Sequence, residues 1–161
     1  MSQDAKIREQ LLKPLAEGGA HIPFAAAVAG LPAGLRGRRV PELAHTAWML
    51  VFHLWIAQND ILEYIRRPGV VSPEYPSGYW PKQDAPESPR EWERKVLAFD
   101  EDLQALCALL RDPEEDLFEP RPKGGDSCLA RAALLAIDHN SYHIGQLVDL
   151  RMLLGAPVRD W

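Results

Sequence analysis

The sequence predicts an all-α protein, and three observations support this. Four long segments carry apolar residues at the three- and four-residue spacing of amphipathic helices. Proline and glycine gather mainly between these segments, and no stretch shows the strict alternation of a half-buried strand. Four helices joined by loops of modest length pack most simply as a four-helix bundle. A chain of 161 residues suits one domain, so we expect residues 1–161 to form a single four-helix-bundle domain.

The first predicted helix covers residues 3–17 and ends at Gly18-Gly19, a common helix stop. The connector that follows contains FAAAVAG, which we expect to form one or two turns. The second predicted helix covers residues 41–66. Pro41 suits a first helical position, and the sequence Arg-Arg-Pro marks the end.

The third predicted helix covers residues 88–110, and it opens with Ser-Pro-Arg-Glu, the pattern of a capping box. The fourth covers residues 127–154 and is stopped by Gly155 and Pro157. Both segments carry long apolar stripes, so each can bury one face against the rest of a bundle.

A proline-rich stretch at residues 70–86 separates the second predicted helix from the third. It is too long for a simple connector in a compact domain, and Tyr75, Tyr79 and Trp80 argue against disorder. We expect the stretch to pack over one end of the bundle and to shape a pocket, although packing alone would also explain the aromatic residues.

Composition and charge exclude several classes of partner. Eighteen Lys and Arg against 23 Asp and Glu give a net charge of -5, so we expect no nucleic-acid binding. The N-terminal stretch is too polar and acidic for a signal peptide, and no segment has the roughly 18 apolar residues of a membrane span. We therefore expect a cytoplasmic protein without a membrane partner, in which Cys107 and Cys128 are buried free thiols.

Two histidines stand one helical turn apart in the stretch DHNSYHIGQ, residues 138–146. His139 and His143 project from one face of the fourth predicted helix, and Gln146 lies a further turn along the same face. Two imidazoles at this spacing can close on one metal ion, and a third ligand must then come from another helix.

His53 is the best candidate for that third ligand, because it lies mid-helix in the apolar stretch MLVFHLWIA. A lone histidine there is more often a hydrogen-bonded core residue, but together with the pair on the fourth helix it favours a metal site. His45 lies near the predicted helix start, which favours a solvent-facing or capping position. His21 lies in the glycine-rich connector, where solvent or a local hydrogen bond suffices.

The stretches HLWIAQNDILEYIRRPGVVSPEYPSGYWP and DHNSYHIGQ resemble the DinB-like superfamily of metal-dependent enzymes, and the similarity runs from HIPF to LLG. The resemblance implies a four-helix bundle that holds a divalent ion through His53, His139 and His143. Phe52 and Trp55 depart from the polar neighbours common in that family. They pack against the long loop or a partner chain, or the substrate differs.

Three imidazoles leave a coordination position open, as in catalytic sites, and nitrogen ligands suit zinc or nickel. Candidates for further roles in catalysis are Gln146, Tyr142 and Asp60. Each has an ordinary structural alternative: an interhelical hydrogen bond for Gln146, a core position for Tyr142, and a solvated position for Asp60.

Three functions remain open from the residues and the resemblance together. The chain is a metal-dependent hydrolase of a small-molecule substrate, a metal-dependent transferase of a low-molecular-weight thiol, or a non-catalytic metal-binding protein associated with stress. We also expect a homodimer, because Trp48, Phe52 and Trp55 spread over more of one helix than a single core can cover.

Overall fold

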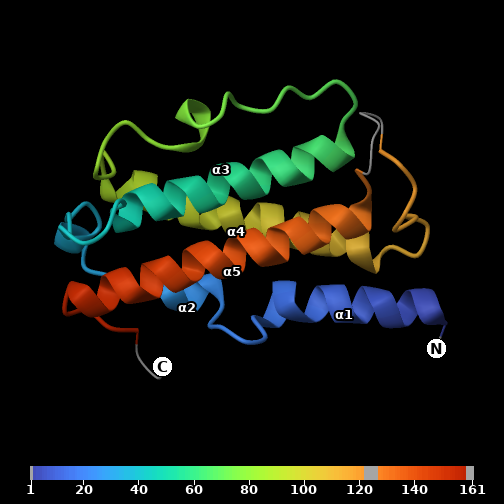
Figure 1. The fold of residues 1–161 in the computed structure, drawn as a ribbon, viewed down its shortest axis with the longest axis horizontal. Helices are drawn as coiled ribbons and strands as arrows, with labels where there is room; N and C mark the ends of the chain where they lie inside the picture. The colour runs from blue at the N-terminus through green and yellow to red at the C-terminus, as the bar shows by residue number, and fades with distance from the viewer. Residues whose placement is uncertain (1, 122–126, 159–161) are drawn as a thin grey trace.

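The computed structural model describes residues 2–121 and 127–158, and within these ranges it contains helices and no strand (Figure 1). The helices are α1 (Gln3–Glu17), α2 (Phe24–Val28), α3 (Ala47–Arg66), α4 (Pro89–Arg111) and α5 (Leu129–Leu153), with short 3-10 turns η1 (Ala33–Leu35) and η2 (Ser77–Tyr79). The all-α prediction is confirmed.

The fourth position of the bundle is divided between two helices. The long helices α3, α4 and α5 lie alongside one another, whereas α1 and α2 follow each other along the lower side of the view (Figure 1). Gly18 and Gly19 separate them with positive φ angles of 93° and 70°, which favour glycine, and Pro23 precedes α2. Three long helices therefore form most of the bundle, and the N-terminal segment completes it in two pieces.

Helix α3 begins at Ala47, later than the predicted Pro41, and a tertiary contact explains the difference. The side-chain oxygen of Thr46 caps the helix by accepting the N–H of Met49 at 3.2 Å. The N–H of Trp48 donates to the carbonyl of Arg36 at 2.8 Å, and that bond prevents a continuous helix through residues 41–47. His45 consequently lies outside α3.

The other predicted boundaries agree closely with the structure. Helix α1 covers the predicted residues, and α4 begins directly after Ser88, whose hydroxyl accepts the N–H of Glu91 at 3.3 Å. The carboxylate of Glu91 accepts the N–H of Glu87 at 2.6 Å, rather than that of Ser88 as in the usual capping box. Helix α5 begins at Leu129, two positions after the predicted start at 127.

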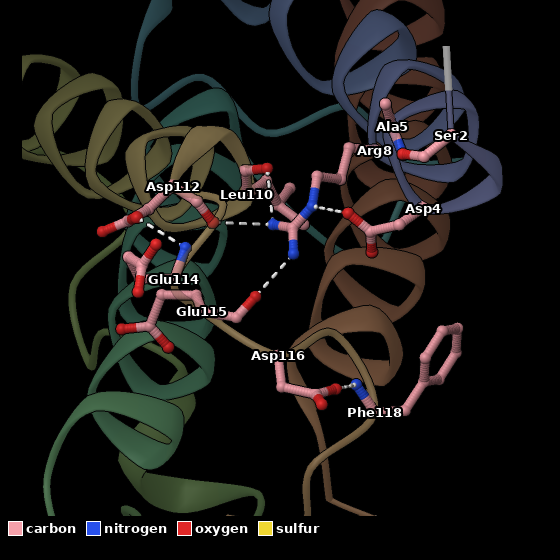
Figure 2. Close-up of polar contacts among 10 residues, drawn as sticks. All are labelled: Ser2, Asp4, Ala5, Arg8, Leu110, Asp112, Glu114, Glu115, Asp116 and Phe118. Carbon is pink, nitrogen blue, oxygen red and sulfur yellow. Dashed lines mark hydrogen bonds and ion pairs between the residues drawn. The ribbon is translucent and has the colours of Figure 1, made fainter.

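A buried arginine joins α1 to the end of α4 (Figure 2). The guanidinium of Arg8 donates to the carbonyls of Leu110 at 3.1 Å, Asp112 at 2.9 Å and Glu115 at 2.5 Å, and to the carboxylate of Asp4 at 2.7 Å. The last carbonyls of a helix lack partners within it and carry partial negative charge, so a cation placed there satisfies both needs.

The apolar core consists of two clusters of buried side chains. One contains Phe24, Trp48, Phe99 and Ile144, and the other contains Leu11, Leu62, Leu106, Leu129 and neighbouring residues. Between them on α3 and α5 lies a polar layer, in which the side chain of Asn140 donates to that of Gln58 at 3.0 Å. His53, His139 and His143 lie along this same middle stretch of the two helices.

The aromatic residues behind the dimer prediction are covered more fully than the sequence indicated. Trp48 is buried in the core, and Phe52 and Trp55 are half-buried against it. The ammonium of Lys95 on α4 lies 3.0 Å from the ring centroid of Trp55 and 5.2 Å from that of Phe52. Phe52 and Trp55 thus pack against α4 and the core, and the homodimer stays a prediction.

Candidate metal centre

Three histidine side chains from α3 and α5 converge on one point. Ligand-capable ring nitrogens of His53, His139 and His143 all lie within 4.8 Å of one another. The Nε2 atom of His53 is 3.0 Å from Nε2 of His139 and 3.1 Å from Nε2 of His143. His53 and His143 are buried and His139 is half-buried, so the cluster is largely withdrawn from water.

Hydrogen bonds on the far side of two rings fix where their protons lie. Nδ1 of His53 donates to the main-chain carbonyl of Tyr79 at 3.1 Å, and Nδ1 of His143 donates to the amide oxygen of Gln146 at 2.8 Å. An oxygen of either kind can only accept, so the proton of each neutral ring is on Nδ1. Nε2 of both rings therefore carries a lone pair.

Burial favours the neutral form of all three rings. It lowers the pKa of His53 and of His143 to about 4, against a partly opposing effect of the hydrogen bonds to Tyr79 and Gln146. Burial also lowers the pKa of His139. At neutral pH the three imidazoles are thus in the form that binds metal ions.

Lone pairs that face each other need a cation between them. The Nε2 atoms of His53 and His143 are 3.1 Å apart, and neither has a proton to donate to the other. Nitrogens bound to one ion at about 2.0–2.1 Å lie roughly 3 Å apart in tetrahedral or octahedral arrangements. Among the described residues, the buried Nδ1 of His139 has no hydrogen-bond partner. The arrangement fits a divalent transition metal ion and leaves the cluster incompletely satisfied without one.

A cleft of about 490 Å³ opens over the three histidines. Its walls are mostly aromatic and aliphatic, with a few polar groups among them. The lining residues besides the three histidines are His45, Ala57, Asp60, Ile61, Tyr75, Tyr79, Trp80, Leu135, Tyr142 and Gln146. A concave apolar site with a few convergent polar groups is the usual form of a small-molecule site.

The long loop between α3 and α4 supplies one side of this cleft. We predicted that this loop packs over one end of the bundle, and that placement is wrong. The loop instead runs back along α3, and in Figure 1 it lies above that helix. The ring of Trp80 stacks on His53 at 3.9 Å between centroids and on His45 at 4.0 Å. Thr46 ties the end of the loop to α3 by donating to the carbonyl of Asp84 at 2.6 Å. Tyr75, Tyr79 and Trp80 of the loop line the cleft, so the prediction that this stretch shapes a pocket is confirmed.

The structure also places the three further candidates. Gln146 orients His143, as described above. Asp60 accepts a hydrogen bond from the hydroxyl of Tyr79 at 2.6 Å and lines the same cleft as the three histidines. Tyr142 is 64% exposed at the rim of the cleft, with its ring 4.9 Å from that of His143, so the alternative of a core aromatic is wrong.

The remaining histidine and cysteine predictions concern residues outside the cluster. His21 has one local partner, the carbonyl of Ile22 at 2.8 Å, and one distant partner, the hydroxyl of Ser141 on α5 at 2.9 Å. Cys107 and Cys128 are both free, Cys107 buried and Cys128 half-buried. His45 lines the cleft behind Trp80, although the sequence predicted a solvent-facing or capping position.

Sequence reasoning missed two parts of the site. One is the carbonyl of Tyr79, which has no sequence signal because every residue has a carbonyl. The other is the position of Trp80 between two imidazoles, for which the aromatic content of the loop was the only indication.

A helical bundle with three converging histidines under an aromatic cleft defines a class of candidate metal-binding proteins. The chain belongs to the DinB superfamily, since the model of that family matches residues 23–147, most of the chain and all three histidines. Comparisons with curated proteins and with solved structures gave no match. In the part of the chain that the structure describes, no helix has both the length and the apolar character needed to cross a membrane.

Proposed function

We propose that His53, His139 and His143 bind a divalent transition metal ion, zinc or nickel, and that the protein is a metal-dependent hydrolase of a small molecule. One observation carries this proposal. The Nε2 atoms of His53 and His143 lie 3.1 Å apart, and each carries a lone pair that faces the other. When bound, such an ion supplies Lewis acidity and lowers the pKa of a coordinated water or thiol toward neutrality.

The residues around the cluster support a site that is open toward the cleft. Gln146 and the carbonyl of Tyr79 hold two rings from behind, and that leaves their Nε2 atoms directed to a common point. Tyr142 at the rim and the apolar walls of Ile61 and Leu135 can hold the organic part of a substrate. Hydrolysis then adds water across an ester, amide or phosphoester bond, and the leaving group takes up the proton.

One observation favours transfer of a low-molecular-weight thiol as a second candidate. Among the described residues that line the cleft, only Asp60 has a carboxylate. This carboxylate already accepts a hydrogen bond from the hydroxyl of Tyr79 at 2.6 Å. A hydrolase benefits from a free general base that takes a proton from water. A thiol that is already deprotonated attacks as the thiolate and needs no such base. In this reaction the thiol proton passes to solvent, the sulfur bonds to an electrophilic carbon, and the displaced group leaves with the electron pair of the broken bond.

Elemental analysis of the untagged protein tests the metal site first. We expect close to one equivalent of zinc or nickel in the parent and little in His139→Ala. A parent protein that takes up no ion, even from a panel of divalent metals, would refute the proposal.

Cobalt substitution then separates an enzyme from a non-catalytic metal-binding protein. The visible spectrum of the cobalt form should change when azide or a small thiol is added, because a three-histidine site keeps a position open. An unchanged spectrum would indicate a closed site. Panels of esters, amides and phosphoesters, and of thiols with electrophiles, distinguish the two reactions, and a chelator should abolish either one.

A further inference from the structure

Tyr79 contacts α3 at two places, two helical turns apart. Its main-chain carbonyl accepts the proton of His53 Nδ1 at 3.1 Å, and its hydroxyl donates to the carboxylate of Asp60 at 2.6 Å. Asp60 lies seven positions after His53, on the same face of the helix. One loop residue therefore links a carboxylate to a candidate metal ligand.

We propose that Asp60 is a positioning residue that acts through Tyr79 to hold His53 in the geometry and tautomer that bind the metal ion. This inference rests on the proposed metal site, and it assigns Asp60 a different role from that of a catalytic base.

The carbonyl of Tyr79 needs an anchor, because the loop around it has little regular structure. Within the turn, the N–H of Tyr79 donates to the carbonyl of Pro76 at 3.1 Å, and that of Gly78 donates to Glu74 at 2.6 Å. These bonds shape the turn but do not attach it to α3. The turn is attached to α3 by the stacking of Trp80 on His53 and by the hydrogen bond from the Tyr79 hydroxyl to Asp60. The hydroxyl belongs to the same residue whose carbonyl meets His53.

The contact between Tyr79 and Asp60 depends on a hydrogen bond that the hydroxyl donates. A tyrosine hydroxyl is protonated at neutral pH, so here the hydroxyl donates and the carboxylate of Asp60 accepts. An amide oxygen can accept the same bond, and asparagine is therefore a conservative replacement for Asp60.

The consequence for the metal ion follows from the second contact. Without the hydrogen bond from its hydroxyl to Asp60, Tyr79 no longer holds its carbonyl in place beside His53. The proton of His53 is then shared between Nδ1 and Nε2, so Nε2 has a free lone pair in only a fraction of the molecules. Partners of this kind behind a ligand typically contribute 10- to 100-fold to metal affinity. Because Asp60 acts through an intermediate residue, we expect about tenfold, the lower end of that range.

Zinc titration of chelator-stripped protein, in competition with a chromophoric chelator at pH 7.5, tests the proposal. Tyr79→Phe and Asp60→Ala should each weaken zinc binding about tenfold, and the double variant should be no weaker than either. Asp60→Asn should bind zinc like the parent. Val71→Ala is the control, because Val71 is 90% exposed on the same loop and is not among the residues that line the cleft. Far-UV circular dichroism and thermal melting identify any variant that has not folded.

The outcomes separate this inference from the proposed function. If the parent binds no zinc, the proposed metal site fails, and the inference fails with it. If the parent binds zinc and Tyr79→Phe binds it equally well, only the inference is overturned. If Asp60→Asn is as weak as Asp60→Ala, the charge of Asp60 matters rather than its hydrogen bond, and positioning through Tyr79 is excluded.

Discussion

The buried polar groups around Arg8 and those around the three histidines both join helices, and they differ in whether the protein itself satisfies them. At Arg8 every contact pairs a donor with an acceptor, three of them carbonyls near the end of α4 (Figure 2). At the histidine cluster the lone pairs of His53 and His143 face each other, and no residue in the described part of the chain pairs with Nδ1 of His139.

The difference indicates which cluster serves the fold and which serves a function. Buried polar groups in native proteins are nearly always hydrogen-bonded, so an exception needs an explanation such as an ion. The Arg8 cluster is complete and needs no further partner. The histidine cluster is complete only with a cation, although the surrounding packing already holds its three rings in place.

Replacing the cluster histidines should give the largest effect and break the comparison most directly. His53→Ala, His139→Ala and His143→Ala should each weaken metal binding by more than about 100-fold, because loss of a ligand costs more than loss of a partner behind it. Metal analysis and zinc titration measure this. His21→Ala and His45→Ala are the controls and should keep the metal content of the parent. Equal content in all five variants would remove the site.

Replacing Arg8 should lower the stability of the fold and leave metal binding unchanged. Arg8→Met keeps a long apolar stem but leaves the carbonyls of Leu110, Asp112 and Glu115 without their donor. Loss of charged hydrogen bonds at a buried site should lower the free energy of unfolding by about 3 kcal/mol.

Urea denaturation of the metal-free proteins measures that change, with Arg66→Met as the control. Arg66 is partly exposed and lies 3.8 Å from Glu63, so its loss should change stability by less than about 0.5 kcal/mol. Folded Arg8→Met should bind one equivalent of metal. A loss of metal from the folded variant would contradict the division into a structural and a functional cluster.

The sequence was sufficient for the parts of this comparison that depend on side-chain identity and spacing. His139 and His143 are one turn apart, and His53 interrupts the most apolar stretch of α3, so the sequence indicated all three members of the cluster. The four long helices followed from apolar periodicity in the same way, with Ser88 and Gly155 marking boundaries that the structure confirms.

The parts that the sequence did not predict depend on main-chain groups or on contacts between distant segments. The start of α3 is set by a bond from Trp48 to the carbonyl of Arg36. The orientation of His53 depends on the carbonyl of Tyr79, and Arg8 meets three carbonyls some 100 positions away in the chain. Carbonyls have no residue identity, so periodicity and motif spacing cannot locate them.

Acid should destabilise the metal-free protein through the histidine cluster. The pKa of His53 and of His143 is about 4 in the folded chain, against an ordinary value of 6.5 in the unfolded chain. Between these values the unfolded chain binds protons that the folded chain does not, so stability is fully present above pH 6.5 and falls as the pH falls. We expect a loss on the order of 2 kcal/mol for each of the two rings between pH 6.5 and 4.5.

Urea denaturation of the chelator-stripped protein across this pH range measures the loss. A variant with His53 and His143 both replaced by glutamine is the matched control, since glutamine does not titrate. Its stability should change less with pH than that of the parent. Parallel curves for the two proteins would mean that the burial of these rings does not govern acid stability.

The smallest expected effect sharpens the comparison at a single hydrogen bond. Gln146 holds the proton of His143 on Nδ1 from one turn further along the same helix, so its loss frees that proton without disturbing the packing of α5. Gln146→Ala should weaken zinc binding about tenfold, as expected for a partner behind a ligand. Gln146→Glu keeps an acceptor at the same place and should bind zinc at least as well as the parent.

Asp149→Ala, at an exposed position on the same helix, should leave zinc binding unchanged. If Gln146→Ala bound zinc like the parent, the tautomer of His143 would not depend on this bond, and the inference that its lone pair faces that of His53 would lose half of its support.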